Sequence, residues 1–532
     1  LHAGGSKSAK EAVRDSRAVG VATSADTGGL DILIDDLRRE TDIFEDDITL
    51  MGKRFPSPLS AIGEDYYKYY ITDTLDVDGM RCVQLTFSPR NPESFSFMGD
   101  LYVALGDTTG FVKKAHMKVP RTINLNYVDN LYIDQTFEQD ADGRRHKTSD
   151  RINLDLSIIT GTQKFHAART TSYANFSYDP RTDLEKAYTM PGGIWVINED
   201  TADARSFDPE LRLVPLSSAE ASMGTFMARL REIPFFYRAE KVLVILAGGY
   251  IKTGNPGYFD IGPINTLISS NTVEGIRFRV GGITTTALSP RWSAGGYVAY
   301  GTRDRKLKYR GDVEYSFIPK KHHRGEFPMN AVRASYSYDV DMIGQHYLFT
   351  NPDNIFLSWK RLRSNLLTYR RLARMEYNLE LRNQLSFCIS AEHTKQIATP
   401  WLPFTDAGGN NFSSYTRATI GLRVRYAPGE KYIQRTSGRI EVNREAPVFI
   451  LAHEWGPKKL FGSDFATSRT ELSVQKRFWF SAFGSLDALL KGGIIWTQVP
   501  YPELLWPNAN LSYTIQPESF SLMNPMEFAL DR

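Results

Sequence analysis

Alternation of apolar and polar residues runs through the second half of the chain and constrains its fold more than any other feature. In LKYRGDVEYSF, Leu307–Phe317, the odd positions are apolar or glycine and the even positions are charged or serine. A period of two puts successive side chains on opposite faces of a β-strand, so this stretch predicts a strand with one apolar and one charged face. The pattern returns in GIRFRV, AVRASYSYDVD, ARMEYNLELR and RATIGLRVRY, and we expect further strands at 291–302, 385–394, 447–455, 469–480 and 486–496. Together these make about ten strands.

Two architectures use such strands. In a soluble sandwich the apolar face is the core and the charged face meets water, whereas in a membrane barrel the apolar face meets lipid and the polar face lines the interior. Strand length favours the barrel, because a spanning strand needs about nine to eleven residues and a sandwich strand typically has about five or six. Aromatic residues also end several apolar stripes, as an interfacial girdle requires. We expect a tight connection at Asp304-Arg305 and long polar ones at 319–329 and 345–369, which suggests short turns on one side of the membrane and long loops on the other.

The alternation assigns a direction to each side chain. The residues expected to line the interior are Arg277, Arg279, Arg310, Asp312, Glu314, Arg333, Asp339, Arg374, Glu376, Glu380, Arg382, Arg417, Arg423 and Arg425. The residues expected to face lipid are Ile276, Phe278, Val313, Tyr315, Tyr336, Leu379, Leu422 and Val424. The interior set mixes signs, so it is either a solvated lumen of no special function or one braced by ion pairs between strands, each contributing about 0.2–1 kcal/mol.

The first half of the chain has a different character. Residues 1–54 predict an irregular lead-in with a short helix, and residues 55–215 predict a β-rich extramembrane domain whose hairpins turn at Asp76–Gly79 and Asp140–Gly143. Residues 216–270 predict a helical connector, with one helix ending before Pro234 and a second from Phe235 to about Ala247. Residues 271–532 would then form the barrel. The predicted fold is therefore mostly β, a transmembrane antiparallel barrel preceded by a smaller β-rich domain and a helix pair.

Composition excludes few classes of protein, but it argues against nucleic acid as a partner. The net charge of +3 over 532 residues gives no strong field for nucleic acid, and two cysteines make no disulfide framework. The sequence contains no phosphate-binding glycine loop and no G-x-S-x-G elbow, and the histidines show no ligand spacing. His453-Glu454 lacks the second histidine of a zinc-protease helix, and His322-His323 lies in a charged connection. We therefore expect no enzyme activity, cofactor or metal.

Several stretches resemble a known family. They are SPLSAIGEDYYKYYI, SFMGDLYVAL, INLNYVDNLYIDQTFEQ, GYIKTGNPGYFDIGPINTLISSNTVEGIRFRVGGITTT, GGYVAYGTRDRKLKYRGDVEY and GIIWTQVPYPELL. In content and order they are similar to the Bacteroidota outer-membrane proteins of unknown function that carry a carboxypeptidase-regulatory-like domain before a β-barrel. The resemblance implies an outer-membrane barrel preceded by a mixed β domain, and it implies no activity. The regulatory-like domain is not found upstream, and family members extend beyond MEFALDR.

The expected function follows from this architecture. We expect a non-enzymatic outer-membrane protein that acts as a scaffold or conduit in protein or lipid traffic, or as a subunit of a membrane complex, with its N-terminal domain in the periplasm. The alternative is a small-solute channel with a charged lumen, and a hydrolase within the barrel has no recognisable site. The expected partners are outer-membrane lipid and other outer-membrane or periplasmic proteins. Because bacterial barrels close with an even number of strands, we also expect a longer protein of about fourteen to sixteen strands.

Overall fold

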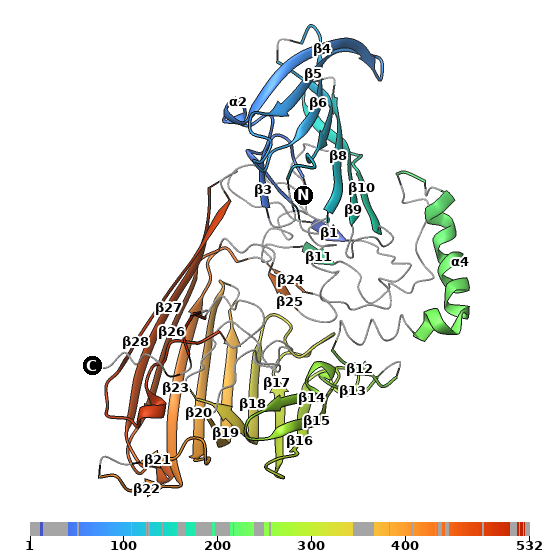
Figure 1. The fold of residues 1–532 in the computed structure, drawn as a ribbon. Coiled ribbons are helices and arrows are strands. Elements are labelled where there is room, and N and C mark those ends of the chain that lie inside the picture. The colour runs from blue at the N-terminus through green and yellow to red at the C-terminus, as the bar shows by residue number, and fades with distance from the viewer. Residues whose placement is uncertain are drawn as a thin grey trace.

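The computed structural model contains two large antiparallel sheets (Figure 1). It describes residues 41–176, 213–238, 249–343, 366–510 and 519–526, with short gaps inside these ranges, together with 11–13 and 194–196. The described chain is mostly β, as the sequence predicts, and helices are few.

The first large sheet is a meander of seven strands in sequence order. Its strands are β4 (Tyr67–Val77), β5 (Met80–Pro89), β6 (Met98–Ala104), β7 (Val112–Lys118), β8 (Val128–Gln139), β9 (Arg145–Leu156) and β10 (Phe165–Ser172). The β4–β5 turn places Asp78 and Gly79 at positive φ, and Gly143 does the same between β8 and β9. The two hairpins predicted at these turns are therefore confirmed.

One face of this sheet is a conventional apolar core. Along β8 the side chains of Leu131, Ile133 and Phe137 are buried, while the intervening positions are partly exposed. The hairpin of β2 (Asp47–Leu50) and β3 (Lys53–Pro56) contributes Ile48 and Phe55 to the same core. The short helix α2 (Gly63–Tyr66) leads into β4, and β1 (Glu11–Val13) pairs separately with β11 (Ile194–Val196).

The connector contains the first predicted helix and also strands that the sequence did not predict. Helix α4 spans Ser218–Glu232, and residues 234–238 are helical again. The rest of the second predicted helix, 239–248, lies outside the described residues. After it come β12 (Ile251–Lys252), β13 (Phe259–Ile261), the 3-10 turn η4 (Ile264–Thr266) and β14 (Ile268–Asn271). No helix of the described chain is long and apolar enough to cross a membrane.

The second large sheet, called the wall below, contains the ten strands that alternation predicts. They are β15 (Gly275–Thr284), β16 (Trp292–Gly301), β17 (Leu307–Ser316), β18 (Asn330–Met342), β19 (Leu367–Glu380), β20 (Leu385–Ile397), β23 (Ser414–Tyr426), β26 (Val448–Gly456), β27 (Thr467–Trp479) and β28 (Ser485–Ile495). Every neighbour is antiparallel.

The wall is open within the described residues. At one edge β13 and β14 pair with successive parts of β15, so they act as one strand interrupted by η4, and β12 extends β13. The other edge is β28. No pairing joins β28 to β12, β13 or β14 in the described chain, so no closed barrel is seen here. The sequence predicts a barrel that residues 271–532 leave incomplete.

The two ends of the wall are distinguished by the N-terminal sheet. The guanidinium of Arg54, on β3, lies 4.9 Å from the ring centroid of Trp479, at the end of β27. We call this the proximal end; it carries the connections 285–291, 317–329, 381–384, 427–447 and 480–484. The distal end carries 302–306, 343–366, 398–413 and 457–466. Long and short connections occur at both ends, so the predicted sorting by length is wrong: the tight turn at Asp304-Arg305 shares the distal end with the connection 343–366.

The remaining short elements lie in these connections. β21 (Phe404–Thr405) and β22 (Asn411–Phe412) form a distal hairpin, and β24 (Tyr432–Gln434) and β25 (Arg439–Glu441) form a proximal one. The 3-10 turn η5 (Leu460–Gly462) is distal, and η7 (Tyr501–Glu503) follows β28.

Candidate functional site

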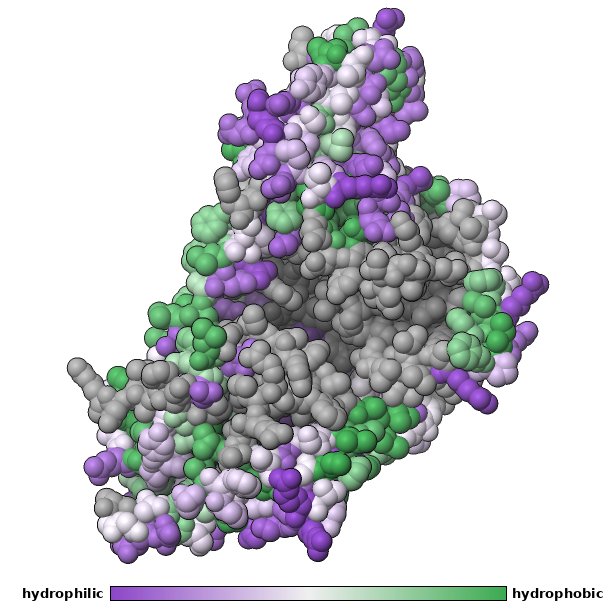
Figure 2. Space-filling view, in the orientation of Figure 1, coloured by the Kyte–Doolittle hydropathy of each residue, from purple (hydrophilic) through white to green (hydrophobic). Residues whose placement is uncertain are grey.

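The wall has the opposite polarity to the sheet of a water-soluble protein. Val313 is 47 % exposed, whereas its neighbours Asp312 and Glu314 are 7 % and 2 % exposed. The same contrast appears on β15, where Ile276 and Phe278 are exposed and Arg277 between them is only 11 % exposed. Figure 2 shows hydrophobic residues gathered on both flanks of the wall.

All eight residues predicted to face lipid lie on the exposed, apolar face. Their positions follow from the strand register, in which Val313 opposes Ala334 and Leu422 opposes Ile389. Ile276, Phe278, Val313, Tyr336 and Leu422 are exposed, and Tyr315, Leu379 and Val424 are partly buried. Large apolar side chains on later strands extend this face, among them Ile420, Leu451, Trp455 and Leu472.

A chain of alternating charges crosses the other face. The Nε of Arg333, on β18, donates to Glu314 of β17 at 2.8 Å, and its Nη1 lies 3.7 Å from Glu376 of β19. Arg374 then pairs with Glu376 at 2.8 Å along the same strand and with Glu392 of β20. These contacts provide the predicted bracing between neighbouring strands for Glu314, Arg333 and Glu376.

The same chain continues to β27. Arg417 of β23 lies 3.8 Å from Glu392 and 3.2 Å from Glu454 of β26. Arg469 of β27 binds Glu454 at 3.0 Å and Glu471 at 3.2 Å. The nine residues of this chain, called the ion ladder, link seven consecutive strands: Glu314, Arg333, Glu376, Arg374, Glu392, Arg417, Glu454, Arg469 and Glu471.

A second buried cluster lies beside β15. Lys308 is fully buried, and its Nζ lies 2.9 Å from Glu274 and 2.6 Å from Asp304. The hydroxyl of Tyr369 donates to the same Asp304 at 2.8 Å. Next to it, Arg277 makes a two-pronged contact with Asp339, at 2.6 and 2.8 Å. A charge this deeply buried is stable only when paired, and here each is.

Other predicted interior residues find other kinds of partner. Arg279 stacks 3.8 Å from the ring centroid of Tyr297 on the neighbouring β16, whereas Arg425 pairs with Glu430 in the following connection at 2.6 Å. Glu380 pairs with Arg439 of β25 at 2.9 Å. Near strand ends the connections bring closer partners than the next strand does.

Three more predicted residues were expected to pair across strands. Arg310 is 42 % exposed at its side chain and lies 3.8 Å from Asp312 on its own strand, which instead receives Arg324 at 3.0 Å. Arg423 is exposed beside Cys388 at a small polar pocket. Arg382 lies outside the described residues.

The sequence also missed several members of the site. Glu392, Glu454, Arg469 and Glu471 lie in strands that the alternation predicted, so assigning faces to those strands would have found them. Glu274 and Asp304 lie in turns, and Glu503 follows the last strand, where no period exists to reveal them.

A segment after β28 lies against the charged face at the distal end. The hydroxyl of Tyr415 donates to Glu503 at 2.9 Å, and the Nε of Arg417 lies 3.6 Å from the same carboxylate. Trp506 packs beside Ile343, Phe404 and Tyr415 in a small apolar cluster. We call residues 497–510 the tail segment; it adds a carboxylate to the ion ladder and covers part of the inner face.

The connection 317–329 folds over the proximal part of the same face. Glu326 accepts the backbone N–H groups of Lys321, at 2.8 Å, and of His322 and His323. Burial alone would raise the pKa of Glu326, but these donors lower the pKa overall. The His322-His323 pair is thus part of a structured connection.

The sequence predicts no metal at His453-Glu454 or at His322-His323, and the structure places both pairs. His453 bonds Thr470 at 2.9 Å on the apolar face, whereas Glu454 joins the ion ladder on the other, so the two cannot share an ion. Among the described residues no group of three or more potential ligands is close enough to hold a metal.

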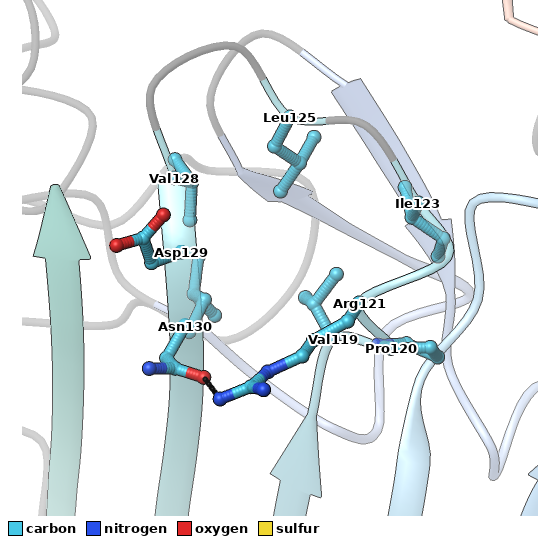
Figure 3. Close-up of a pocket in the computed structure, with 9 residues that line it drawn as sticks. Val119, Pro120, Arg121, Ile123, Leu125, Val128, Asp129 and Asn130 are labelled. Atoms are coloured by element: carbon cyan, nitrogen blue, oxygen red, sulfur yellow. Dashed lines mark hydrogen bonds between the residues drawn. The ribbon is translucent and has the colours of Figure 1, made fainter. Parts of the chain in front are cut away.

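A pocket of about 320 Å³ lies where the β7–β8 connection crosses the end of the core of the seven-stranded sheet (Figure 3). Val119, Ile123 and Leu125 line it, and Arg121 reaches across to Asn130 at 3.4 Å. No pair of lining residues forms an acid–base or nucleophilic arrangement, so the cavity is not a candidate catalytic site.

The fold and this site define a mostly β protein whose large antiparallel sheet buries charge on one face and exposes apolar side chains on the other. Residues 15–176 match a family of unknown function (DUF5686), and residues 348–501 match the C-terminal domain of that family. No curated protein and no solved structure matches the chain. The resemblance seen in the sequence is supported as far as a family of unknown function.

Proposed function

We propose that the wall is part of an outer-membrane β-barrel, with its apolar face against lipid and the ion ladder inside. The single observation that carries this is the reversed polarity of the wall. In water, exposing so many large apolar side chains costs about 25 cal/mol per Å², and burying the charges costs several kcal/mol per ion before pairing. In a bilayer the apolar face of the wall contacts lipid, which it prefers to water. Only the charges on the other face then need partners.

Strand dimensions support the same proposal. The ten strands from β15 to β28 run from nine residues in β26 to fourteen in β19, enough to cross a hydrocarbon core of about 30 Å when tilted. The edges at β28 and at β12 to β14 need strand partners in lipid, since unpaired backbone groups have no water there. Further strands would complete the wall.

The role proposed for this wall is a scaffold or closed conduit in protein or lipid traffic, without enzyme activity. The ion ladder and the tail segment fill space that an open pore would leave to solvent. The seven-stranded sheet provides a module outside the membrane, which we place on the periplasmic side. The Bacteroidota origin and the tie to proteins with a carboxypeptidase-regulatory-like domain rest on the sequence resemblance.

A matched pair of neighbouring residues tests the membrane assignment. Leu422→Cys and Arg423→Cys, in a chain carrying Cys82→Ala and Cys388→Ala, place spin labels on opposite faces of β23. After reconstitution into lipid vesicles, we expect oxygen dissolved in the bilayer to relax the label at 422 and a water-soluble nickel complex not to reach it. Strong relaxation of the 422 label by the nickel complex would refute the membrane wall.

The alternative function, a small-solute channel, is supported by the charged inner face. Planar-bilayer recordings of the purified protein separate the two. A scaffold closed by the tail segment should give little conductance, whereas a channel should give discrete steps that depend on ion charge.

A further inference from the structure

The outward, apolar face of the wall carries charged side chains at very few positions. On the ten described strands from β15 to β28, the register places every aspartate and glutamate on the inner face. The outward cations of these strands are Arg371 on β19, Lys395 on β20 and Lys476 on β27. The charge on the outward face of these strands is therefore positive only.

Two of these cations lie side by side at the distal end of the wall. Arg371 and Lys395 are directly opposite each other in the register of β19 and β20. Like charges at opposed positions repel and destabilise a strand pair. Within the described part of the chain, no carboxylate lies within 4 Å of either side chain. The pair therefore attracts an anion that the described chain does not supply.

The acids at this end of the wall have other partners. Asp304 accepts the Nζ of Lys308 at 2.6 Å and the hydroxyl of Tyr369 at 2.8 Å. Asp464 accepts the backbone N–H of Thr416 at 2.6 Å. Neither acid offsets the repulsion between the two outward cations.

Tyrosine rings extend the cationic pair toward the distal edge. The guanidinium of Arg371 lies 5.4 Å from the ring centroid of Tyr338, which stacks on the ring of Tyr369 at 5.9 Å. The Nζ of Lys306, in the connection 302–306, lies 3.9 Å from the centroid of Tyr369. Arginine, lysine and tyrosine are typical of a lipid–water boundary, where the polar end of each side chain meets headgroups and the rest meets acyl chains.

The cations lie where the apolar stripes of their strands end. On β20 the outward residues from Leu385 to Ala391 are apolar, and Lys395 is the second outward position after them. On β19 Arg371 is the next outward position after Ala373. In Figure 1 this end of the wall, marked by the β21–β22 hairpin, is the one away from the seven-stranded sheet. If the wall spans a bilayer, the two cations are at the level of the distal headgroups.

We propose that Arg371, Lys395 and Lys306 form a phosphate-binding patch on the lipid-facing side of the wall, occupied by the headgroup phosphate of an anionic lipid in the distal leaflet. The proposal rests on the membrane-spanning role of the wall and adds a preference for one class of lipid. A phosphate between Arg371 and Lys395 replaces their repulsion by two attractions, and the guanidinium can donate two parallel N–H bonds to it. The acyl chains of the same lipid then lie along the apolar stripes of β19 and β20.

A fluorescent label beside the patch reports which lipid is its neighbour. The full chain carries Cys82→Ala, Cys388→Ala and one labelled cysteine, at Thr416→Cys opposite Lys395 or at Val424→Cys toward the other end of β23. The vesicles are phosphatidylcholine with a small fraction of a quencher lipid, which is phosphatidic acid or phosphatidylcholine with a nitroxide near the headgroup. The ratio of quenching by the two lipids measures local enrichment of the anionic one.

We expect phosphatidic acid to quench the label at 416 several-fold more than phosphatidylcholine does, and the two lipids to quench the label at 424 equally. Arg371→Gln with Lys395→Gln should remove the preference at 416 without removing quenching itself. Lys476→Gln, which removes the exposed outward lysine near the proximal end of β27, is the matched control and should keep the preference.

Equal quenching at 416 by the two lipids, with the label at 424 still quenched, overturns the patch and leaves the wall in the membrane. A preference at 416 that survives in the double variant also overturns it, because other groups then select the lipid. A preference that added inorganic phosphate removes overturns the assignment to lipid and points to a site for free phosphate. Quenching by lipid at neither position refutes the proposed function itself.

Discussion

At the scale of single residues, the wall depends on arginines that each serve several carboxylates. Arg417 is 11 % exposed and lies within 4 Å of Glu392, Glu454 and Glu503. Its planar guanidinium presents five N–H donors in a fixed fork, whereas a lysine ammonium has three. Removal of one arginine from the ion ladder therefore affects several carboxylates at once.

Arg417→Ala should destabilise the wall strongly. It takes the guanidinium away from Glu503 and leaves Glu392 and Glu454 with one arginine each, Arg374 and Arg469. Breaking a buried pair in this way costs about 3–5 kcal/mol. Urea unfolding in lipid vesicles measures this free energy. Arg310→Ala, which removes an exposed arginine on the same sheet face, is the control and should change the free energy of unfolding little. An Arg417→Ala protein as stable as the control would show that the ladder does not brace the wall.

A second residue-scale prediction concerns His116 of β7 and Asp134 of β8, whose side chains meet at 2.6 Å. The hydrogen bond to Asp134 raises the pKa of His116, and the hydrogen bond from His116 lowers the pKa of Asp134. The raised histidine pKa adds stability that is complete below about 6.5 and lost as pH rises through the higher folded value. The lowered aspartate pKa adds stability that is complete above about 3.9 and lost as pH falls through the lower folded value.

The stability contributed by this pair should therefore peak between about pH 4 and pH 6.5. Hydrogen exchange of the β7 and β8 amides in the full chain, compared between the wild type and His116→Gln, checks it. The variant should lose protection most near pH 5 and least above pH 8. A difference that grows with rising pH would contradict the assignment.

At the scale of elements, the alternation of apolar and polar residues predicted half-buried strands and no other kind of element. It located the strands from β15 to β28 and sorted the faces of five of them, β15, β17, β18, β19 and β23, because a half-buried strand must repeat every two residues. It could not find β13 and β14, where Pro263 and η4 interrupt one strand into pieces of three and four residues. Periodicity in the sequence could not predict the position of the tail segment either, because Glu503 and Trp506 are fixed by tertiary contacts.

The direction of the faces gives a depth-dependent prediction. Ile420 is at the centre of β23 and 50 % exposed, whereas Phe449 is near the proximal end of β26. In a bilayer, Ile420→Arg should cost about 2–4 kcal/mol and Phe449→Arg about 0–1 kcal/mol. Unfolding titrations in vesicles give both values. Two small and equal costs would indicate that this face meets water.

At the scale of the whole molecule, three parts meet the wall at different places. The β2–β3 hairpin, which packs on the seven-stranded sheet, touches the proximal end of the wall through Arg54 and Trp479. The connection 317–329 covers part of the inner face, and the tail segment covers the distal part. This arrangement favours a braced and partly filled interior over an empty one. The sequence could predict the separate β-rich module but not its contacts, which depend on residues far apart in the chain.

Removing the contacts that Glu503 and Trp506 make should expose the tail segment to protease without unfolding the wall. In Glu503→Gln with Trp506→Ala, the carboxylate charge beside Arg417 and the ring in the distal apolar cluster are both lost. Limited proteolysis in vesicles should then cut within 497–510 several-fold faster than in wild type. Gln498→Ala, which removes an exposed amide from the same segment, is the control. Unchanged cleavage in the double variant would mean that other contacts hold the segment.

The ion ladder also determines where the wall would come apart under tension in its plane. Separating any two strands from β17 to β27 breaks a row of backbone hydrogen bonds and at least one ion pair on the inner face. Between β27 and β28 the backbone bonds are accompanied by the ion pair of Arg477 and Asp487, at 2.5 Å. Its aspartate is 59 % exposed, so water weakens the pair. The seam between β27 and β28 is therefore weaker than the seams inside the ladder. A force that pulled the wall open from this edge would peel β28 away first, while the seven laddered strands stayed together as one stiff panel.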